Sequence, residues 1–142
     1  MRIFALTVAA VLLACEARAA ADVGALRASG DWRLTEPGGR VACTLTFTRQ
    51  TSFAGYELKA PLACRRAFPP LKLVAAWAMD GKGAIVLSDA HAQPIVTFPA
   101  QAKGPYEAKA PDGRTWRLEP LRSDHDAAGA GERPISTAPP FG

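Results

Sequence analysis

The stretch Val41-Ala42-Cys43-Thr44-Leu45-Thr46-Phe47-Thr48 has the clearest two-residue period in the 142-residue chain. Successive side chains of a β-strand point to opposite faces of the sheet. Cys43, Leu45 and Phe47 would therefore lie on one face, and the threonines would lie on the other. The stretch predicts a β-strand with one buried face.

Short segments of the same kind lie on both sides of this strand, separated by Gly, Pro and Asp at intervals of roughly ten residues. They span residues 31–34, 56–58, 73–79, 83–89, 95–98, 106–108 and 114–118. Within this block we find no ten-residue apolar stripe of helical period that is free of Gly and Pro. The pattern predicts an all-β fold, an eight-stranded antiparallel up-and-down barrel, with a β-sandwich as the alternative.

An eight-stranded barrel is wide enough either to be filled by its own side chains or to hold one small ligand. Large apolar residues at strand spacing favour a filled interior here. The predicted barrel core consists of Trp32, Leu34, Leu45, Phe47, Trp77, Leu87, Phe98, Trp116 and Leu118.

The N-terminus has the pattern of a secretory signal, with Arg2 followed by the apolar run 3–14 and a site rich in small residues. Cleavage after Ala19 would remove residues 1–19 and leave a free amine at Ala20. Cleavage after residue 14, within Leu12-Leu13-Ala14-Cys15, would instead make Cys15 the acylated terminus of a membrane-anchored lipoprotein. We favour cleavage after Ala19.

Export would leave two cysteines, Cys43 and Cys64, which predicts one disulfide in an oxidising compartment. Residues 20–29 are rich in alanine and have no strand pattern, so we expect a leading arm or tether. Residues 122–142 contain Gly, Pro and scattered charges with little apolar material, which predicts a disordered tail.

The sequence has few residues suited to catalysis. His91 falls in a predicted turn, and His125 lies in the tail between two aspartates. We find no nucleophile setting, acidic pair, phosphate-binding loop or zinc-cysteine spacing. The formal net charge is only +4, and its cations are spread along the chain, so a nucleic-acid partner is not expected. These observations predict a binding protein without enzymatic activity, cofactor or bound metal.

Several short strings, taken in order, resemble the bacterial alkaline protease inhibitor family. The strings are Gly30-Asp31-Trp32-Arg33-Leu34, Cys43-Thr44-Leu45, Gly55-Tyr56-Glu57-Leu58, Cys64, Pro70-Leu71, Ala76-Trp77, Leu87-Ser88-Asp89-Ala90, Gly104-Pro105-Tyr106 and residues 111–118, Pro-Asp-Gly-Arg-Thr-Trp-Arg-Leu. They cover about ninety residues, which is nearly the whole of the predicted barrel.

The resemblance implies a lipocalin-like barrel over residues 30–121 that acts as a monomeric, periplasmic inhibitor of serralysin-type secreted zinc metalloproteases. It also implies a trunk that enters the protease cleft with its terminal amine near the catalytic zinc. In this chain the trunk would be Ala20, Ala21, Asp22, Val23 and Gly24. The family's domain also occurs in outer-membrane lipoproteins, so a lipid-anchored envelope protein is the alternative, and a small-ligand carrier is a third hypothesis.

Overall fold

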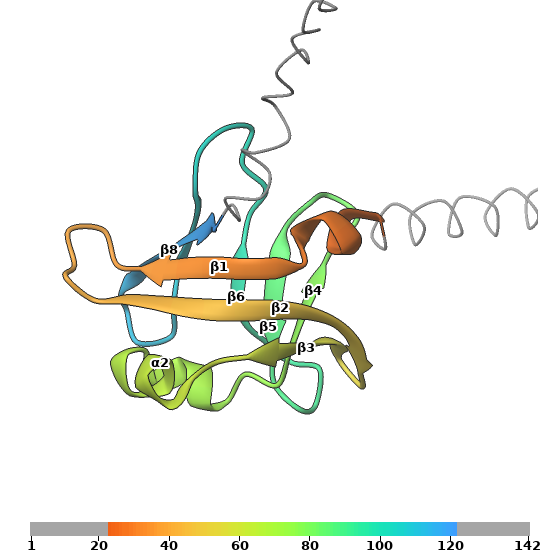
Figure 1. Cartoon of the computed structure of the whole chain (residues 1–142), viewed down its shortest axis with the longest axis horizontal. Coiled ribbons are helices and arrows are strands. Elements are labelled where there is room, and N and C mark those ends of the chain that lie inside the picture. The colour runs from red at the N-terminus through yellow and green to blue at the C-terminus, as the bar shows by residue number, and fades with distance from the viewer. Residues whose placement is uncertain (1–22, 122–142) are drawn as a thin grey trace, which may run out of the picture.

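The computed structural model describes residues 23–121, which form one antiparallel sheet of eight strands curled into a nearly closed barrel (Figure 1). The strands are β1 (Gly30–Thr35), β2 (Ala42–Ser52), β3 (Gly55–Lys59), β4 (Ala76–Met79), β5 (Ile85–Ser88), β6 (Pro94–Phe98), β7 (Tyr106–Lys109) and β8 (Thr115–Pro120).

The sheet order is β6-β5-β4-β3-β2-β1-β8-β7, so β8 pairs with β1 and brings β7 round to β6. All paired strands are antiparallel, and nearly every neighbour in the sheet is also a neighbour in sequence. The predicted eight-stranded up-and-down barrel is confirmed. None of the helices in the described part of the chain is long and apolar enough to cross a membrane.

The alternation of buried and exposed side chains along β2 shows which face of the sheet lies inside the barrel. Cys43, Leu45 and Phe47 are buried, as the alternation predicts. Leu45 lies opposite Trp32 of β1, and Phe47 lies opposite Leu58 of β3. This register gives both neighbouring strands the same buried face, because side chains directly opposite each other in a pair share one side of the sheet.

Stacked aromatic rings fill the interior. Phe47 stacks on Trp77 with ring centroids 4.8 Å apart, and it also stacks on Trp32 at 5.3 Å. The indole N–H of Trp77 donates a hydrogen bond to the Thr48 carbonyl oxygen at 3.1 Å. All nine residues of the predicted core are buried, and Phe68, Leu71, Ile85 and Val96 join them.

The segment between β3 and β4 differs from the prediction. It forms a short helix, α2 (Leu62–Ala67), and a 3-10 turn, η1 (Pro69–Lys72), and the strand expected from residue 73 begins only at Ala76. Leu73 is 68% exposed, so it does not share the buried face of Trp77 as a strand over residues 73–79 would require. Prolines 69 and 70 suit the first turn of a helix, where a backbone N–H has no intrahelical partner in any case.

The disulfide between Cys43 and Cys64 ties β2 to α2, with a Cα–Cα distance of 5.3 Å, and it confirms the predicted pairing. The bond closes a loop with a sequence separation of 21 residues. We expect the Cys43→Ala/Cys64→Ala variant to lose about 3 kcal/mol of unfolding free energy, because the unfolded chain regains the entropy of the open loop. Urea unfolding of the variant and the oxidised parent measures this difference, and a loss below about 1 kcal/mol would contradict it.

Arg114 joins three segments at the end of the barrel next to α2. Its guanidinium forms ion pairs with Asp112 at 2.7 Å and Glu36 at 3.4 Å, donates to the Ala67 carbonyl oxygen at 3.1 Å, and lies over the Phe68 ring. Burial alone would raise the pKa of Asp112, but the hydrogen bonds and charge of Arg114 outweigh burial and lower that pKa.

A lowered folded-state pKa means that Asp112 stabilises the fold above the ordinary aspartate pKa of about 4, and that this stabilisation is lost as the pH falls through the folded-state value. We therefore expect Asp112→Asn to reduce the loss of stability below about pH 4. Urea midpoints of parent and variant from pH 7 to pH 2 measure this effect. Parallel pH profiles would show that Asp112 makes no such contribution.

Candidate functional site

The described chain starts with a helical segment, residues 23–28, that lies across one end of the barrel (Figure 1). This segment belongs to the region 20–29 for which an arm or tether was predicted. Val23 is half exposed, whereas Ala25 and Ala28 are buried against the barrel. Gly24 lies so close to β4 that a Cβ placed on it would be 2.7 Å from the Met79 sulfur. Of the predicted trunk, Ala20, Ala21 and Asp22 lie outside the described residues, as do Cys15 and His125.

Side-chain hydrogen bonds fix the C-terminal end of this helical segment. The Trp32 indole N–H donates to the Ala28 carbonyl oxygen at 2.7 Å, and the Ser29 hydroxyl donates to the Leu26 carbonyl oxygen at 2.8 Å. Arg49 of β2 in turn donates to the Ser29 hydroxyl at 2.9 Å. The last carbonyls of a helix lack intrahelical partners, so these bonds both satisfy the carbonyls and hold the segment on the barrel.

Trp32→Phe is a mild test of this anchor, because it keeps an aromatic ring but removes the buried indole donor. We expect a loss of about 1 kcal/mol of unfolding free energy. Hydrogen exchange of the Ser29 amide, which donates to the Ala25 carbonyl oxygen at 3.0 Å, should accelerate more than exchange in β5. Unchanged exchange at Ser29 would show that the indole bond does not hold the segment.

A groove of about 280 Å³ lies beside the helical segment. It is lined by Gly24, Arg27, Ala28, Trp32, Met79, Tyr106 and Pro120. Tyr106 meets Trp32 edge-on at 5.8 Å, so aromatic side chains form part of its wall. The groove is open and mainly apolar, and Arg27 is the one residue of its lining with a charged side chain.

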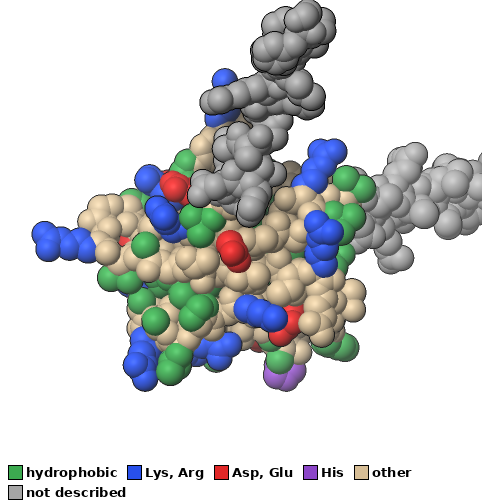
Figure 2. All heavy atoms as spheres, viewed as in Figure 1, with side chains coloured by type: hydrophobic (Ala, Val, Ile, Leu, Met, Phe, Trp, Pro, Cys, Tyr) green, Lys and Arg blue, Asp and Glu red, His purple; other side chains and the backbone are tan. Residues whose placement is uncertain are grey.

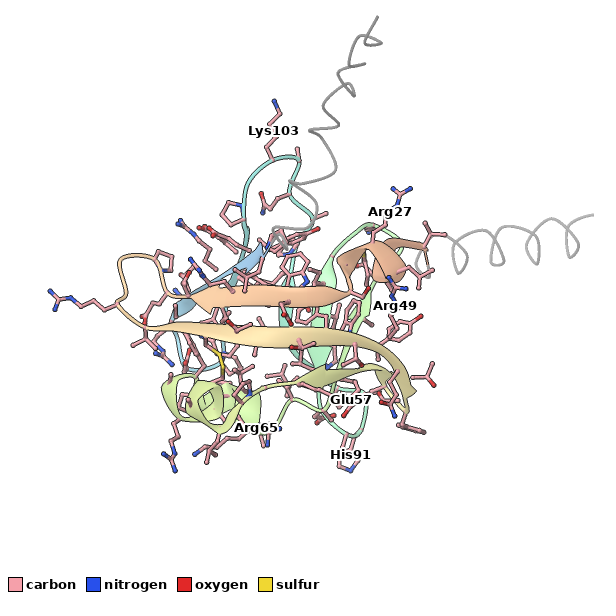
Figure 3. All side chains as sticks on the ribbon, in the orientation of Figure 1. Arg27, Arg49, Glu57, Arg65, His91 and Lys103 are labelled. Carbon is pink, nitrogen blue, oxygen red and sulfur yellow. A yellow bond between two sulfur atoms is a disulfide. The ribbon has the colours of Figure 1, made fainter. Side chains whose placement is uncertain are left out.

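The turns β2–β3, β4–β5 and β6–β7 surround this end of the barrel, because the strands are antiparallel and β1 starts here. Phe53, in the β2–β3 turn, is 90% exposed. Figure 3 shows Arg27 and Arg49 on the side of the N-terminal segment, and Lys103 on the β6–β7 loop. We call this surface, formed by residues 23–28, the three turns and the groove, the trunk end. Aromatic side chains and arginines are enriched in protein-binding surfaces, and the trunk end exposes both.

The described residues contain no group of three or more His, Cys, Asp or Glu side chains that could hold a metal ion. His91 lies in the β5–β6 turn, where its backbone N–H donates to a carboxylate oxygen of Asp89 at 2.8 Å, and Gln93 N–H donates to the same oxygen at 2.9 Å. The bond from Gln93 is the main reason why the pKa of Asp89 is lowered. Asp89 and His91 therefore have the arrangement of turn-forming residues.

The sequence reasoning did not identify Phe53, Met79 and Tyr106 as parts of one surface. The sequence predicts that these residues lie near strand ends. It does not predict which strand ends are neighbours in space, because that depends on how the sheet curls. The helical segment 23–28 was also missed, because six residues are fewer than the two turns needed to recognise an apolar stripe.

Comparison with known proteins agrees with the fold. The structure is similar to the crystal structure of a psychrophilic marine protease MP inhibitor, with a TM-score of 0.54 and 17% sequence identity over 69% of this chain and 99% of that one. At this identity the likeness concerns the fold alone. No protein with a curated description matches the chain significantly. The sequence pattern of the protease inhibitor Inh family matches residues 22–119, which include the helical segment and nearly all of the barrel. The chain therefore belongs to the Inh family of protease inhibitors.

Proposed function

We propose that the protein is an exported, periplasmic inhibitor of a serralysin-type zinc metalloprotease, with the trunk Ala20–Gly24 entering the active-site cleft and the trunk end packing on its rim. The family match over residues 22–119 is the observation that carries this proposal, because it joins the last three residues of the trunk to the barrel in one unit. The anchored segment 23–28 supports it, since a trunk held on a rigid barrel loses less entropy on binding than a free peptide.

The mechanism follows from the chemistry of the trunk terminus. A neutral terminal amine at Ala20 is a competent zinc ligand and would take the position of the catalytic water. Three residues precede Val23 in a chain that starts at Ala20, so the amine can reach about 10 Å beyond Val23. Alanine side chains at positions 20 and 21 suit a narrow cleft because they add little volume.

The direct test is a titration of a purified serralysin-type protease with the exported protein, whose first residue is determined by mass spectrometry. We expect protease activity to fall linearly to zero at one equivalent of protein that begins at Ala20. Full protease activity in an excess of this protein would contradict the proposal.

A lipid-anchored envelope protein is the second candidate, favoured by Leu12-Leu13-Ala14-Cys15. An acylated terminal amine cannot bind zinc as the trunk mechanism requires, so one molecule cannot serve both functions. Fatty-acid labelling of the parent but not of Cys15→Ser would support the anchor, and absence of label in the parent would exclude it. The third hypothesis, a ligand carrier, is disfavoured because the Trp32, Phe47 and Trp77 rings occupy the barrel interior.

A further inference from the structure

The segment from Leu62 to Leu73 closes the end of the barrel opposite the trunk end, and it is amphipathic. Cys64, Phe68 and Leu71 are buried at helical spacing, so they form the inner face. The outer side chains are exposed, and two of them are large apolar groups, Leu62 at 62% and Leu73 at 68% exposure. We call the exposed set Leu62, Arg65, Arg66, Lys72 and Leu73 the basic cap.

All charged side chains of the basic cap are positive. Arg65, Arg66 and Lys72 are exposed, and none of them forms an ion pair with another described residue. The sequence contains no acidic residue between Glu57 and Asp80. Figure 2 shows hydrophobic side chains and Lys or Arg side chains over α2, with no acidic side chain among them on the face shown.

The acidic groups on the other segments at this end have partners of their own. Glu36 and Asp112 form ion pairs with Arg114, and Asp89 accepts backbone N–H bonds within its turn. The cations of the basic cap are therefore available to an external anion. A further exposed apolar residue, Val41, lies near the basic cap. It is two residues before Cys43, and the disulfide joins Cys43 to Cys64 in α2.

We propose that the basic cap binds the surface of an anionic phospholipid membrane. Exposed leucines beside arginine and lysine are the combination by which short amphipathic segments lie in a membrane interface, with the cations at the headgroups and the apolar groups at the acyl boundary. A purely polar anionic surface would satisfy the cations but would leave Leu62 and Leu73 without an apolar environment, whereas the lipid surface fits both features of the cap.

This binding would orient the molecule. Figure 3 shows Arg65 of the basic cap and Arg27 of the trunk end on opposite sides of the barrel. A barrel that rests on the membrane through the basic cap presents the trunk to the aqueous phase, where a soluble protease can reach it. The inference concerns a different surface from the proposed inhibitory one, so either can fail without the other.

The test is co-sedimentation of the exported Cys15→Ser protein, in which no acyl group can contribute, with vesicles of phosphatidylglycerol and phosphatidylcholine or of phosphatidylcholine alone. We expect binding to the anionic vesicles and at least about tenfold weaker binding to the neutral ones. Arg65→Gln/Arg66→Gln should weaken binding to anionic vesicles by about 25-fold, from about fivefold for each cation. Leu62→Gln/Leu73→Gln should weaken it by about tenfold, and this loss should persist at high salt.

Arg27→Gln/Lys103→Gln is the matched control, because it removes the same charge at the trunk end and should change vesicle binding by less than about threefold. Near-ultraviolet circular dichroism checks that all variants keep the fold. Three results would overturn the proposal: no binding of the Cys15→Ser protein to anionic vesicles, equal losses in the two charge variants, or no effect of the leucine variant. The last would indicate a purely electrostatic surface suited to an acidic macromolecule.

Discussion

One extra residue in front of Ala20 is expected to raise the inhibition constant against a serralysin-type protease by about 100-fold or more, which corresponds to roughly 3 kcal/mol. In the proposed mechanism the extension would move the terminal amine away from the zinc and leave an amide nitrogen in its place, and an amide nitrogen is not a zinc ligand at neutral pH. The segment 23–28 cannot easily shift to compensate, because Trp32, Ser29 and Arg49 fix its C-terminal end.

The matched control is Ala20→Ser, which keeps both the free amine and a small side chain, and it should change the inhibition constant by less than about fivefold. Inhibition constants of the three proteins, measured with a peptide substrate, decide the question. Equal inhibition by the extended chain and its parent would show that the amine does not act at the metal.

Trp77→Ala is expected to lower the unfolding free energy by about 4 kcal/mol. Trp77 is fully buried, stacks on Phe47 at 4.8 Å, contacts the tilted Tyr56 ring at 5.4 Å, and donates a hydrogen bond to the Thr48 carbonyl oxygen. The substitution opens a large cavity and leaves that carbonyl oxygen without this donor. A domain of this size has a total stability of only about 5–15 kcal/mol, so the variant would be close to unfolding.

Phe53→Ala serves as the control for ring removal, because Phe53 is 90% exposed, and we expect a stability change below about 0.5 kcal/mol. Urea unfolding followed by circular dichroism gives both values. A loss of less than about 2 kcal/mol in Trp77→Ala would show that the aromatic stack is not the centre of the core.

The barrel was predictable because its strands are marked by short-range, periodic patterns of apolar residues in the sequence. The alternation in residues 41–48 is long enough to identify a strand and its buried face, and the Gly, Pro and Asp turns divide the remaining chain into strand-length pieces. Leu45 and Phe47 follow directly from this period. The Cys43–Cys64 pairing followed from counting, since an exported chain without Cys15 has only two cysteines to join.

The helical parts were not predictable in the same way. In α2 and η1 the inner face consists of only Cys64, Phe68 and Leu71, and Pro69 and Pro70 interrupt this short helical period. The sequence pattern predicted that the next strand starts at Leu73, but β4 starts three residues later, at Ala76. For the same reason the sequence alone indicated only scattered cations, whereas α2 and η1 together bring those of the basic cap to one exposed surface.

The trunk end could be predicted only in part. The signal-like run at residues 3–14 indicated where a mature chain would start, and the family resemblance assigned residues 20–24 to the trunk. The groove beside Tyr106 and Met79 depends on how β4, β7 and β8 end around the segment 23–28, which is a long-range property of the curled sheet. Local sequence contains no signal for such a meeting of distant strand ends.

The most direct test of the trunk mechanism uses a serralysin-type protease in which cobalt(II) replaces the zinc, because the visible absorption of cobalt reports its ligands. With the protein that begins at Ala20, we predict a new cobalt spectrum that saturates at one equivalent, as the amine replaces the bound water. The protein with an acetylated terminus should leave the spectrum unchanged. Complete inhibition by the Ala20 protein with an unaltered cobalt spectrum would contradict an amine at the metal.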